Sequence, residues 1–307
     1  MTLTEQATTP GRADAGAATA DVADLGVARP LRADVWRRFK RNRMAVLGLG
    51  FIVLLALVAI FAPWIAPYSI TERASGEFRD GPSADHWFGT DPIGRDVFSR
   101  VVFGARVSLR IGFLATLIAL MVGLVLGSTA GFFGGGTDSL IMRLTDVFLS
   151  IPYIILAVSI ATVVGRSENS IILILGLTGW LFVTRIVRAS FLGLRRLEYV
   201  EAATALGFSR PRIMFRHILP NALQPIIVYG TIAIGSVILA EAALSFVGVG
   251  PQEPTPAWGR MVADAGGGSL ASAPHMLFFP AGAIVLTVLS FILVGDGLRD
   301  SLDPKLK

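Results

Sequence analysis

The chain contains no cysteine, and only 16% of its 307 residues are charged. The lack of cysteine excludes disulfide bonds and thiolate metal ligands. Soluble domains carry about 25% charged residues, so a chain that is 53% hydrophobic and this poor in charge belongs to another class. His86, His217 and His275 lie far apart without a companion at ligand spacing, so we expect no metal site. The composition therefore predicts a polytopic membrane protein.

Lysine is nearly absent, occurring only as Lys40, Lys305 and Lys307, and none of the three follows a glycine. The chain therefore lacks the GxxxxGK[ST] loop that binds nucleotide phosphates. We find no nucleophile–base pair either, so we expect no catalytic residue and no cofactor in this chain. The net charge of +5 comes from arginines beside apolar runs, which favours cytoplasmic loops of a membrane protein over a nucleic-acid surface.

Long apolar runs predict an all-α fold with six membrane-spanning helices. Residues 1–30, rich in Ala, Thr, Asp and Gly, predict a disordered tail, and residues 31–307 predict one transmembrane domain. Met44–Ile65 has no charge over 22 residues, and at about 33 Å such a helix crosses a hydrocarbon core of about 30 Å. The expected spans are about 44–66, 107–131, 139–164, 170–189, 222–245 and 276–297, with extramembrane loops at 67–106 and 190–221.

Six spans place both termini on one side, and the positive-inside rule identifies that side. With the N-terminus in the cytoplasm, 19 Lys and Arg residues lie inside and 8 outside. We therefore expect cytoplasmic termini, an external loop at 67–106 and a cytoplasmic loop at 190–221. Asp96–Arg106 predicts an amphipathic helix on the outer surface, while Gly123, Gly127 and Gly131 predict close approach of another helix to the second span.

The predicted cytoplasmic loop contains the start and stop signals of two helices. Arg195–Leu206 lacks Pro and Gly and predicts a helix that Gly207 ends. Ser209 suits the N-cap of a second helix, with Pro211 in its first turn and Pro220 at its end.

Two further features complete this loop. Asn221 with Gln224 resembles a capping box for the fifth span. Leu197, Glu201, Ala205 and Phe208 share a face of the first helix. From the residues alone, a solvated amphipathic loop and a docking surface for a partner are equally good interpretations of that face.

A resemblance separates the two interpretations. Residues 198–221, with Glu-Ala-Ala at 201–203, Gly207 and Pro-Asn at 220–221, resemble the EAA loop of ABC importer permeases. The resemblance implies the type I permease fold and a coupling helix that docks in a groove of an ATPase subunit. It assigns the ATPase contact to Glu201, Ala202, Ala203, Gly207 and Phe208.

Three more stretches narrow the resemblance. Residues 86–100, 134–146 and 241–259 are similar to elements of the second permease subunit of dipeptide, oligopeptide and nickel importers. This implies a non-enzymatic channel subunit of the bacterial inner membrane that carries peptides, with nickel chelates, glutathione and haem as alternative cargo. It also implies as partners a second permease, two ATP-binding subunits that hold ATP and Mg²⁺, and an external substrate-binding protein.

Charged residues outside the EAA loop have two interpretations each. Asp91, Arg95 and Asp96 either pair with one another and cap a helix, or contact the external binding protein. Asp146 and Glu241 lie near span ends, where they either contact substrate in the pathway or are satisfied by interfacial water and a neighbouring Arg.

A secondary transporter that works without ATP is the alternative from another class. It would show inverted repeats or charged residues in the middle of its spans. Neither is evident in the sequence, and such a protein would have no need of the EAA pattern.

Overall fold

The computed structural model describes residues 31–74, 78–266 and 272–302, and the all-α class is confirmed over these ranges. A single β-bridge joins Thr90 to Asp96 there and does not extend into a strand. The predicted tail at 1–30 lies outside the described residues. Five helices are long and apolar enough to cross a membrane, and a bent pair of shorter helices makes a sixth candidate.

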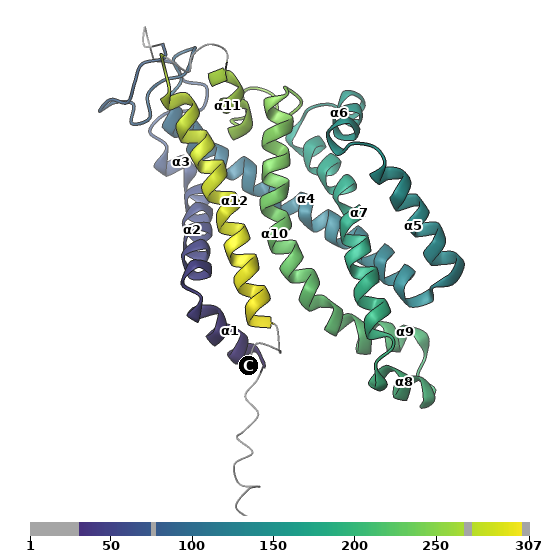
Figure 1. Cartoon of the computed structure of the whole chain (residues 1–307). Coiled ribbons are helices and arrows are strands. Elements are labelled where there is room, and N and C mark those ends of the chain that lie inside the picture. The colour runs from purple at the N-terminus through teal and green to yellow at the C-terminus, as the bar shows by residue number, and fades with distance from the viewer. Residues whose placement is uncertain (1–30, 75–77, 267–271, 303–307) are drawn as a thin grey trace, which may run out of the picture.

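The helices follow one another as an antiparallel bundle with a small elbow at one end (Figure 1). In chain order they are α1 (Leu31–Arg41), α2 (Arg43–Ile60), α3 (Ala62–Ile65), α4 (Val97–Phe133), α5 (Gly135–Leu149), α6 (Tyr153–Val164), α7 (Glu168–Leu194), α8 (Glu198–Ala205), α9 (Arg210–Arg212), the π-helical segment η1 (Ile213–Ile218), α10 (Leu219–Phe246), α11 (Trp258–Gly266) and α12 (His275–Leu302).

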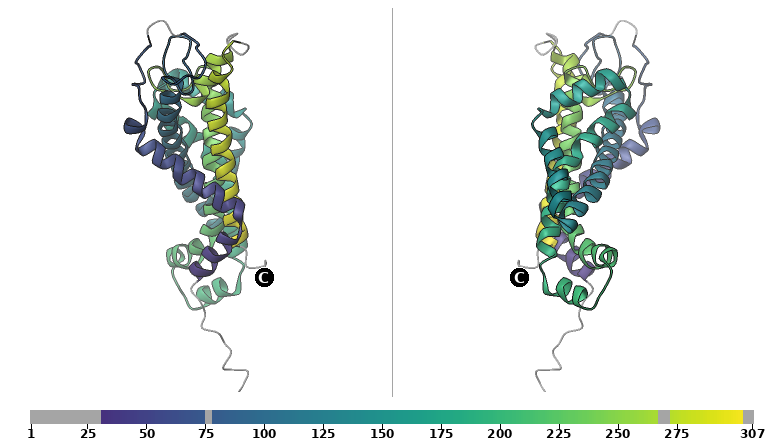
Figure 2. Two further views of the ribbon diagram at one scale, coloured as in Figure 1. Left: turned by 90° about the vertical axis from the view of Figure 1, so that its left-hand side faces the viewer. Right: turned by 90° about the vertical axis from the view of Figure 1, so that its right-hand side faces the viewer.

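Both described ends of the chain lie at the same end of the bundle, which an even number of crossings requires. Figure 1 shows α1 and the last turns of α12 at the bottom, the end that also holds α8 and α9. The loop that follows α3, together with α11, lies at the top, and the side views of Figure 2 agree with this division. The elbow and the loop predicted to be external therefore lie at opposite ends of the bundle.

The most extensive helix contact in the described residues joins α4 to α7, and glycines make it possible. A Cβ on Gly127 would lie 2.6 Å from the carbonyl oxygen of Thr184, and one on Gly131 would lie 2.6 Å from Cβ of Phe191. A Cβ on Gly123 would overlap the side chain of Val183. The predicted small-residue face is confirmed, because the two backbones approach closer than any larger side chain permits.

The expected surface helix at 96–106 is wrong as a separate element. Val97–Phe133 is one continuous helix whose N-cap, Asp96, accepts a hydrogen bond from the Ser99 amide. Gly104 lies within this helix and does not interrupt it. Because glycine has no side chain, the ring of Trp258 packs directly against the helix at this position. The helix thus extends beyond the second apolar run toward the outer loop.

The predicted third span over 139–164 is not one straight helix. The chain forms α5 and α6, which meet at an angle of 86° across a short break. Pro152 explains the break, because it has no amide hydrogen to donate and its ring pushes Ile151 out of the helical region. The bend turns one apolar run into two helices.

Pro220 does not end a helix, contrary to expectation. Arg210–Phe246 runs on as α9, η1 and α10, and Pro220 sits in the first turn of α10. The π-helical turn before it shifts the register, so that the Leu219 amide donates to Met214, five residues back. Pro220 has no amide hydrogen to donate, and it therefore lies where the pattern of helical hydrogen bonds is already changing.

The capping box is wrong for the same reason, since Asn221 lies inside this continuous helix. Its Nδ2 donates to the carbonyl of His217 at 2.8 Å and to the hydroxyl of Tyr199 at 3.3 Å. Asn221 thus fastens α8 to α10 instead of starting a helix.

Replacing Gly127 with Ala tests the α4–α7 contact. The new methyl group would overlap the Thr184 carbonyl, and we expect a loss of about 1–3 kcal/mol of stability from overpacking. Gly193→Ala, in α7 with open space around it, is the matched control and should be neutral or slightly stabilising. Melting temperatures of both variants in detergent measure the difference, and equal values would contradict this packing.

Candidate functional site

The elbow between α7 and α10 is the candidate site, and a glycine shapes it. Gly207 has φ of +75°, its amide donates to Thr204, and the amide of Phe208 donates back to Ala203. These two bonds form the Schellman pattern that closes a helix C-terminus, so Gly207 ends α8 as predicted. The turn sends the chain directly into α9, with Ser209 at its N-cap position and Pro211 in its first turn.

Packing holds α8 against the start of α10. Val200 and Ala203 are buried in one apolar cluster with Ile213 and Ile218 of η1. The first elbow helix is also shorter than predicted, because α7 continues to Leu194 and α8 begins at Glu198. The elbow is therefore a packed unit and not a loose loop.

The five residues assigned to the ATPase contact divide by exposure. Glu201, Ala202 and Gly207 are exposed at the bottom of the molecule, and Phe208 is partly buried. Ala203 is buried and faces the elbow's own core. A partner could touch Glu201, Ala202, Gly207 and Phe208. The small side chain of Ala203 instead allows α8 and η1 to approach each other. The roles themselves stay predictions.

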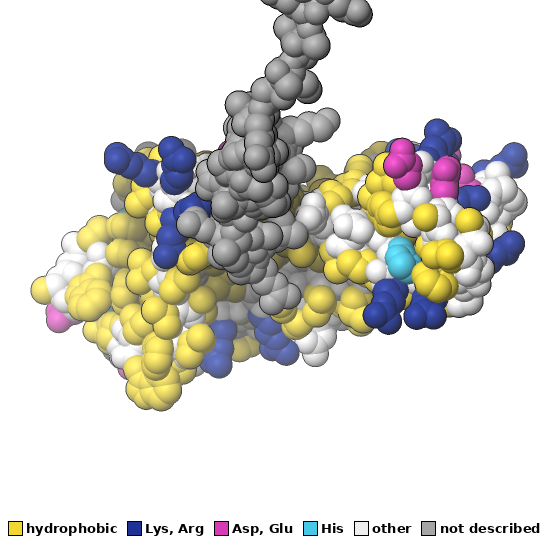
Figure 3. Space-filling model, turned by 90° about the horizontal axis from the view of Figure 1, so that it is seen from below, with side chains coloured by type: hydrophobic (Ala, Val, Ile, Leu, Met, Phe, Trp, Pro, Cys, Tyr) yellow, Lys and Arg dark blue, Asp and Glu magenta, His cyan; other side chains and the backbone are white. Residues whose placement is uncertain are grey.

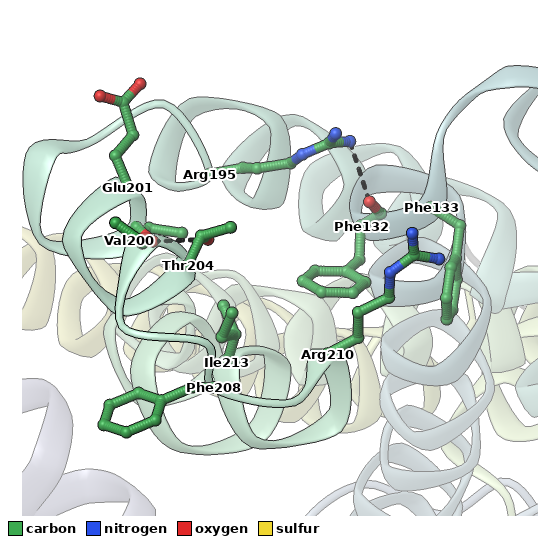
Figure 4. Close-up of a pocket in the computed structure, with 10 residues that line it drawn as sticks. Phe132, Phe133, Arg195, Val200, Glu201, Thr204, Phe208, Arg210 and Ile213 are labelled. Atoms are coloured by element: carbon green, nitrogen blue, oxygen red, sulfur yellow. Dashed lines mark hydrogen bonds between the residues drawn. The ribbon is translucent and has the colours of Figure 1, made fainter.

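A hollow of about 750 Å³ lies between the elbow and the end of α4 (Figure 4). Arg195 crosses it and donates to the backbone carbonyl of Phe132 at 2.9 Å, while Arg210 extends toward Phe133. Glu201 points away from these residues into solvent. The lining residues are Phe132, Phe133, Arg195, Val200, Glu201, Thr204, Ala205, Phe208, Arg210 and Ile213.

Phe208 is oriented by two neighbours on the second elbow helix. The guanidinium carbon of Arg212 lies 4.7 Å from the centre of its ring, and His217 stacks on it at 5.7 Å. A cation over an aromatic face stabilises the pair. The ring is thus held at the edge of the elbow, where part of it remains accessible.

At the opposite end, Asp91, Arg95 and Asp96 are buried and paired within the chain. The Arg95 Nε donates to Asp91 at 2.5 Å, and its Nη1 donates to Glu253 at 2.6 Å. Asp96 caps α4 and pairs with the ring of His86 at 2.9 Å. The capping and ion-pairing interpretation is confirmed by these contacts, and burial leaves little of the three side chains for an external protein to touch.

Glu253 completes this outer cluster and was missed from the sequence. It accepts from Arg95 and, at 3.2 Å, from the fully buried Arg100 of α4. Burial alone would raise the pKa of the Glu253 carboxyl, yet the charge of Arg100 and the hydrogen bond from Arg95 hold that pKa below its usual value. Burial opposes the charge on Arg95, but Glu253 and Asp91 outweigh it and raise the pKa of that guanidinium.

The two predicted pathway residues lie in different surroundings. Asp146 of α5 is exposed and pairs with Arg185 of α7 at 2.6 Å. Glu241 of α10 is completely buried, its Oε1 accepting from the hydroxyl of Ser245 at 2.5 Å. Among the described residues nothing donates to its Oε2. Only Asp146 is open to a solute in this conformation.

The sequence also missed two arginine partners on α7. Arg185 pairs with Asp146, and Arg188 makes a bidentate pair with Asp138, one arm of which measures 2.6 Å. The arginines' spacing of three residues, which places them on one side of a helix, was the available signal.

Comparisons with known proteins agree with this geometry. Residues 123–307 match the family described as "Binding-protein-dependent transport system inner membrane component". Residues 30–82 match the N-terminal TM domain of oligopeptide transport permease C. Together the two matches cover most of the chain and leave out residues 1–29 and 83–122.

Relatives of known name are similar over nearly the full length. The dipeptide transport system permease protein of Alkalihalophilus pseudofirmus is 44% identical over 274 residues, covering 89% of this chain and 90% of the relative. The oligopeptide transport system permease protein of Bacillus subtilis is 42% identical with the same coverage. The glutathione transport system permease protein of Escherichia coli O157:H7 is 44% identical over 275 residues, again covering 89% and 90%.

A solved structure shares the fold. The MetNI methionine ABC transporter in inward-facing conformations matches with a TM-score of 0.55 at 22% identity, covering 66% of this chain and 97% of that one. At this identity the match speaks for the arrangement of helices alone.

Substitution of Gly207 tests how the elbow is built. Nothing lies within 4 Å of a Cβ at this position, so only the positive φ opposes a side chain. Gly207→Val should loosen the end of α8, because a β-branched residue in the left-handed region costs about 1–2 kcal/mol or more. Gly207→Asn should keep the turn, since Asn tolerates that region. Hydrogen exchange of the α8 amides measures the effect, and equal protection in both variants would rule out this account.

Proposed function

The chain belongs to the family of binding-protein-dependent transport system inner membrane components, and we propose that it is the peptide-carrying permease subunit of an ATP-driven importer. It is a multi-pass membrane protein with the helices of the type I permease fold. We assign to it half of a translocation pathway, which a second permease subunit completes. The observation that carries the proposal is the packed elbow of the EAA loop, which presents Glu201 at the end of the bundle that holds both described chain ends.

Charge supports the cytoplasmic orientation of that end. Seen from below, the molecule displays Lys and Arg side chains around its margin (Figure 3). They belong mainly to α1 and to the elbow, both of which begin or end an apolar helix. Positive residues beside spans favour the cytoplasm, so the elbow faces the compartment that contains ATP. The membrane is then the bacterial plasma membrane, with both termini inside.

The elbow couples the ATPase to the bundle in this proposal. Glu201, Ala202, Gly207 and Phe208 contact the ATP-binding subunit, and Ala203 holds α8 to η1. Force on α8 reaches α10 through the continuous helix that starts at Arg210. It reaches α4 through the hydrogen bond from Arg195 to Phe132. Movement of the docked elbow would thus shift two spanning helices together and alternate the access of the pathway.

The other components follow from the family. Two ATP-binding subunits supply hydrolysis and hold ATP and Mg²⁺, because this sequence has no phosphate-binding loop of its own. We assign delivery of the solute to an external substrate-binding protein, because the family is described as binding-protein-dependent. The permease subunit therefore performs no chemistry itself, and an ATP-independent secondary transporter becomes the weaker alternative.

Short peptides are the solute class that the relatives favour. All three reported relatives are named for a dipeptide, an oligopeptide or glutathione, which is itself a tripeptide. Nickel chelates and haem, the other solutes considered, have no such support among them. The proposed cargo is a di- or oligopeptide, with glutathione as the second candidate.

Reversing the charge of Glu201 tests the coupling role. Glu201→Lys in the full transporter should lower peptide uptake at least about tenfold while the complex still assembles, since a contact-making carboxylate is lost and replaced by a repelling charge. Uptake and ATP hydrolysis are measured together in proteoliposomes. Glu198→Lys, with the same charge change on the same helix, is the matched control and should retain most uptake.

Co-purification provides the second arm of this test. The chain should be isolated together with an ATPase and another permease. Active uptake by the chain alone, or unchanged uptake in Glu201→Lys, would refute the coupling proposal.

A further inference from the structure

An ion pair lies exposed on the side of the bundle, among apolar helices. The side chains of Asp146 and Arg185, joined at 2.6 Å, are 61% and 48% exposed. Arg185 is bracketed on α7 by Thr184 and Val187, which lie against Gly127 in the apolar C-terminal part of α4. The pair is therefore level with the part of the bundle that crosses the membrane. Exposed charges at that depth are strongly disfavoured in lipid and point to water or protein instead.

The break between α5 and α6 leads to the same conclusion independently. The helical hydrogen bonds of α5 end at Ser150, whose amide donates to Asp146, and Ser150, Ile151 and Pro152 are all exposed. Phe148, just before the break, contacts the ring of Trp180 near the middle of α7. Irregular backbone at membrane depth is tolerated only where protein buries it or where it lines a water-filled cavity. Nothing in the described residues covers this break.

Asp146 and Ser150 are four residues apart, so they share one face of α5.

The opposite flank of the molecule offers a contrast. On α2 the exposed side chains are apolar, among them Leu47, Leu54 and Ile60, and no charge interrupts them until the helix ends. Figure 1 shows α2 and α5 on opposite sides of the bundle. The α2 side suits lipid, whereas on the α5 side an exposed ion pair and an open break interrupt the apolar surface.

We propose that Asp146 and Arg185 form a charged station in the water-filled pathway, which binds the ammonium and carboxylate ends of a zwitterionic peptide. The proposal rests on the importer function argued above and names a site within it. The second permease subunit would cover the flanking apolar residues of α5, among them Leu140 and Leu144, and enclose the station.

The paired charges indicate the class of solute. A dipolar solute can replace the internal pair charge for charge, with its ammonium on Asp146 and its carboxylate on Arg185. A solute with a single charge would separate the pair and leave one member without a partner, which is costly away from bulk water. Because both side chains are about half exposed, each can be approached without moving a helix.

The chain's lack of cysteine makes the station directly testable, since one introduced thiol is then unique in this subunit. Ser150→Cys changes one atom on the station's face of α5. Gly50→Cys, at an exposed and open position of α2, is the matched control. Both variants are studied in membrane vesicles that contain the complete transporter.

A charged, membrane-impermeant thiol reagent should modify Ser150→Cys at least about tenfold faster than Gly50→Cys, because the reactive thiolate forms in water and not in lipid. An apolar maleimide should modify both and show that each thiol is present. Equal slow reaction of the two variants with the charged reagent would overturn the pathway assignment.

Protection by solute tests the ligand class. Dialanine should slow the modification of Ser150→Cys, and N-acetylalanine methylamide, which has neither charge, should not. Protection should disappear when Arg185→Gln is added. Equal protection by the two compounds, or by neither, would overturn the proposed recognition of charged ends. Co-purification with the ATPase and the uptake of the Glu201 variant do not depend on these rates, so failure here is distinguishable from failure of the proposed function.

Discussion

The contact between α4 and α7 is the constraint on which the arrangement of the site depends. Glycines at 123, 127 and 131 remove side chains from one face of α4, so the backbone of α7 lies against it over several turns. Lipid tails are as apolar as the helices they surround, which leaves close packing as the main force that joins helices in a membrane. This contact also aligns the ends of the two helices. Arg195, just past α7, can therefore reach the Phe132 carbonyl at the end of α4 and anchor the elbow.

The sequence predicted what depends on periodicity and punctuation, and failed where the backbone was irregular. Each predicted span falls on one of the five long apolar helices or on the bent pair of α5 and α6. Gly207 ends α8 as predicted, because the helix C-terminus needs a residue with positive φ and glycine adopts it without strain. Pro152 and Pro220 show the limit of such arguments. Both prolines lack an amide hydrogen. Pro152 breaks the helix into α5 and α6, whereas Pro220 follows the π-helical turn of η1 without ending the helix. The difference depends on the register of neighbouring hydrogen bonds, which the sequence does not display.

Charged residues were harder to assign, because their partners lie far away along the chain. Glu253 meets Arg95 and Arg100 across more than 150 residues, and both arginines are buried although Glu253 itself is partly open to water. Asp146 and Arg185 also pair across distant segments, but on an open face. The same chemistry therefore serves two purposes. The buried outer cluster fastens the external loop to α4, whereas the exposed pair keeps both charges within reach of a solute.

The continuity of Arg210–Phe246 connects these two regions to the elbow. A helix that starts in the elbow and ends beside the outer loop transmits displacement along its axis, since its backbone hydrogen bonds resist stretching. At its outer end Ala242 lies directly against Gly259 of α11, where no side chain intervenes to absorb the movement. The outer cluster resists the same movement by holding Glu253, which precedes α11, to α4. A displacement of α8 is thus opposed at the outer end of α10. The loosely packed flank formed by α5 and α6 is then the part of the bundle that can move most easily.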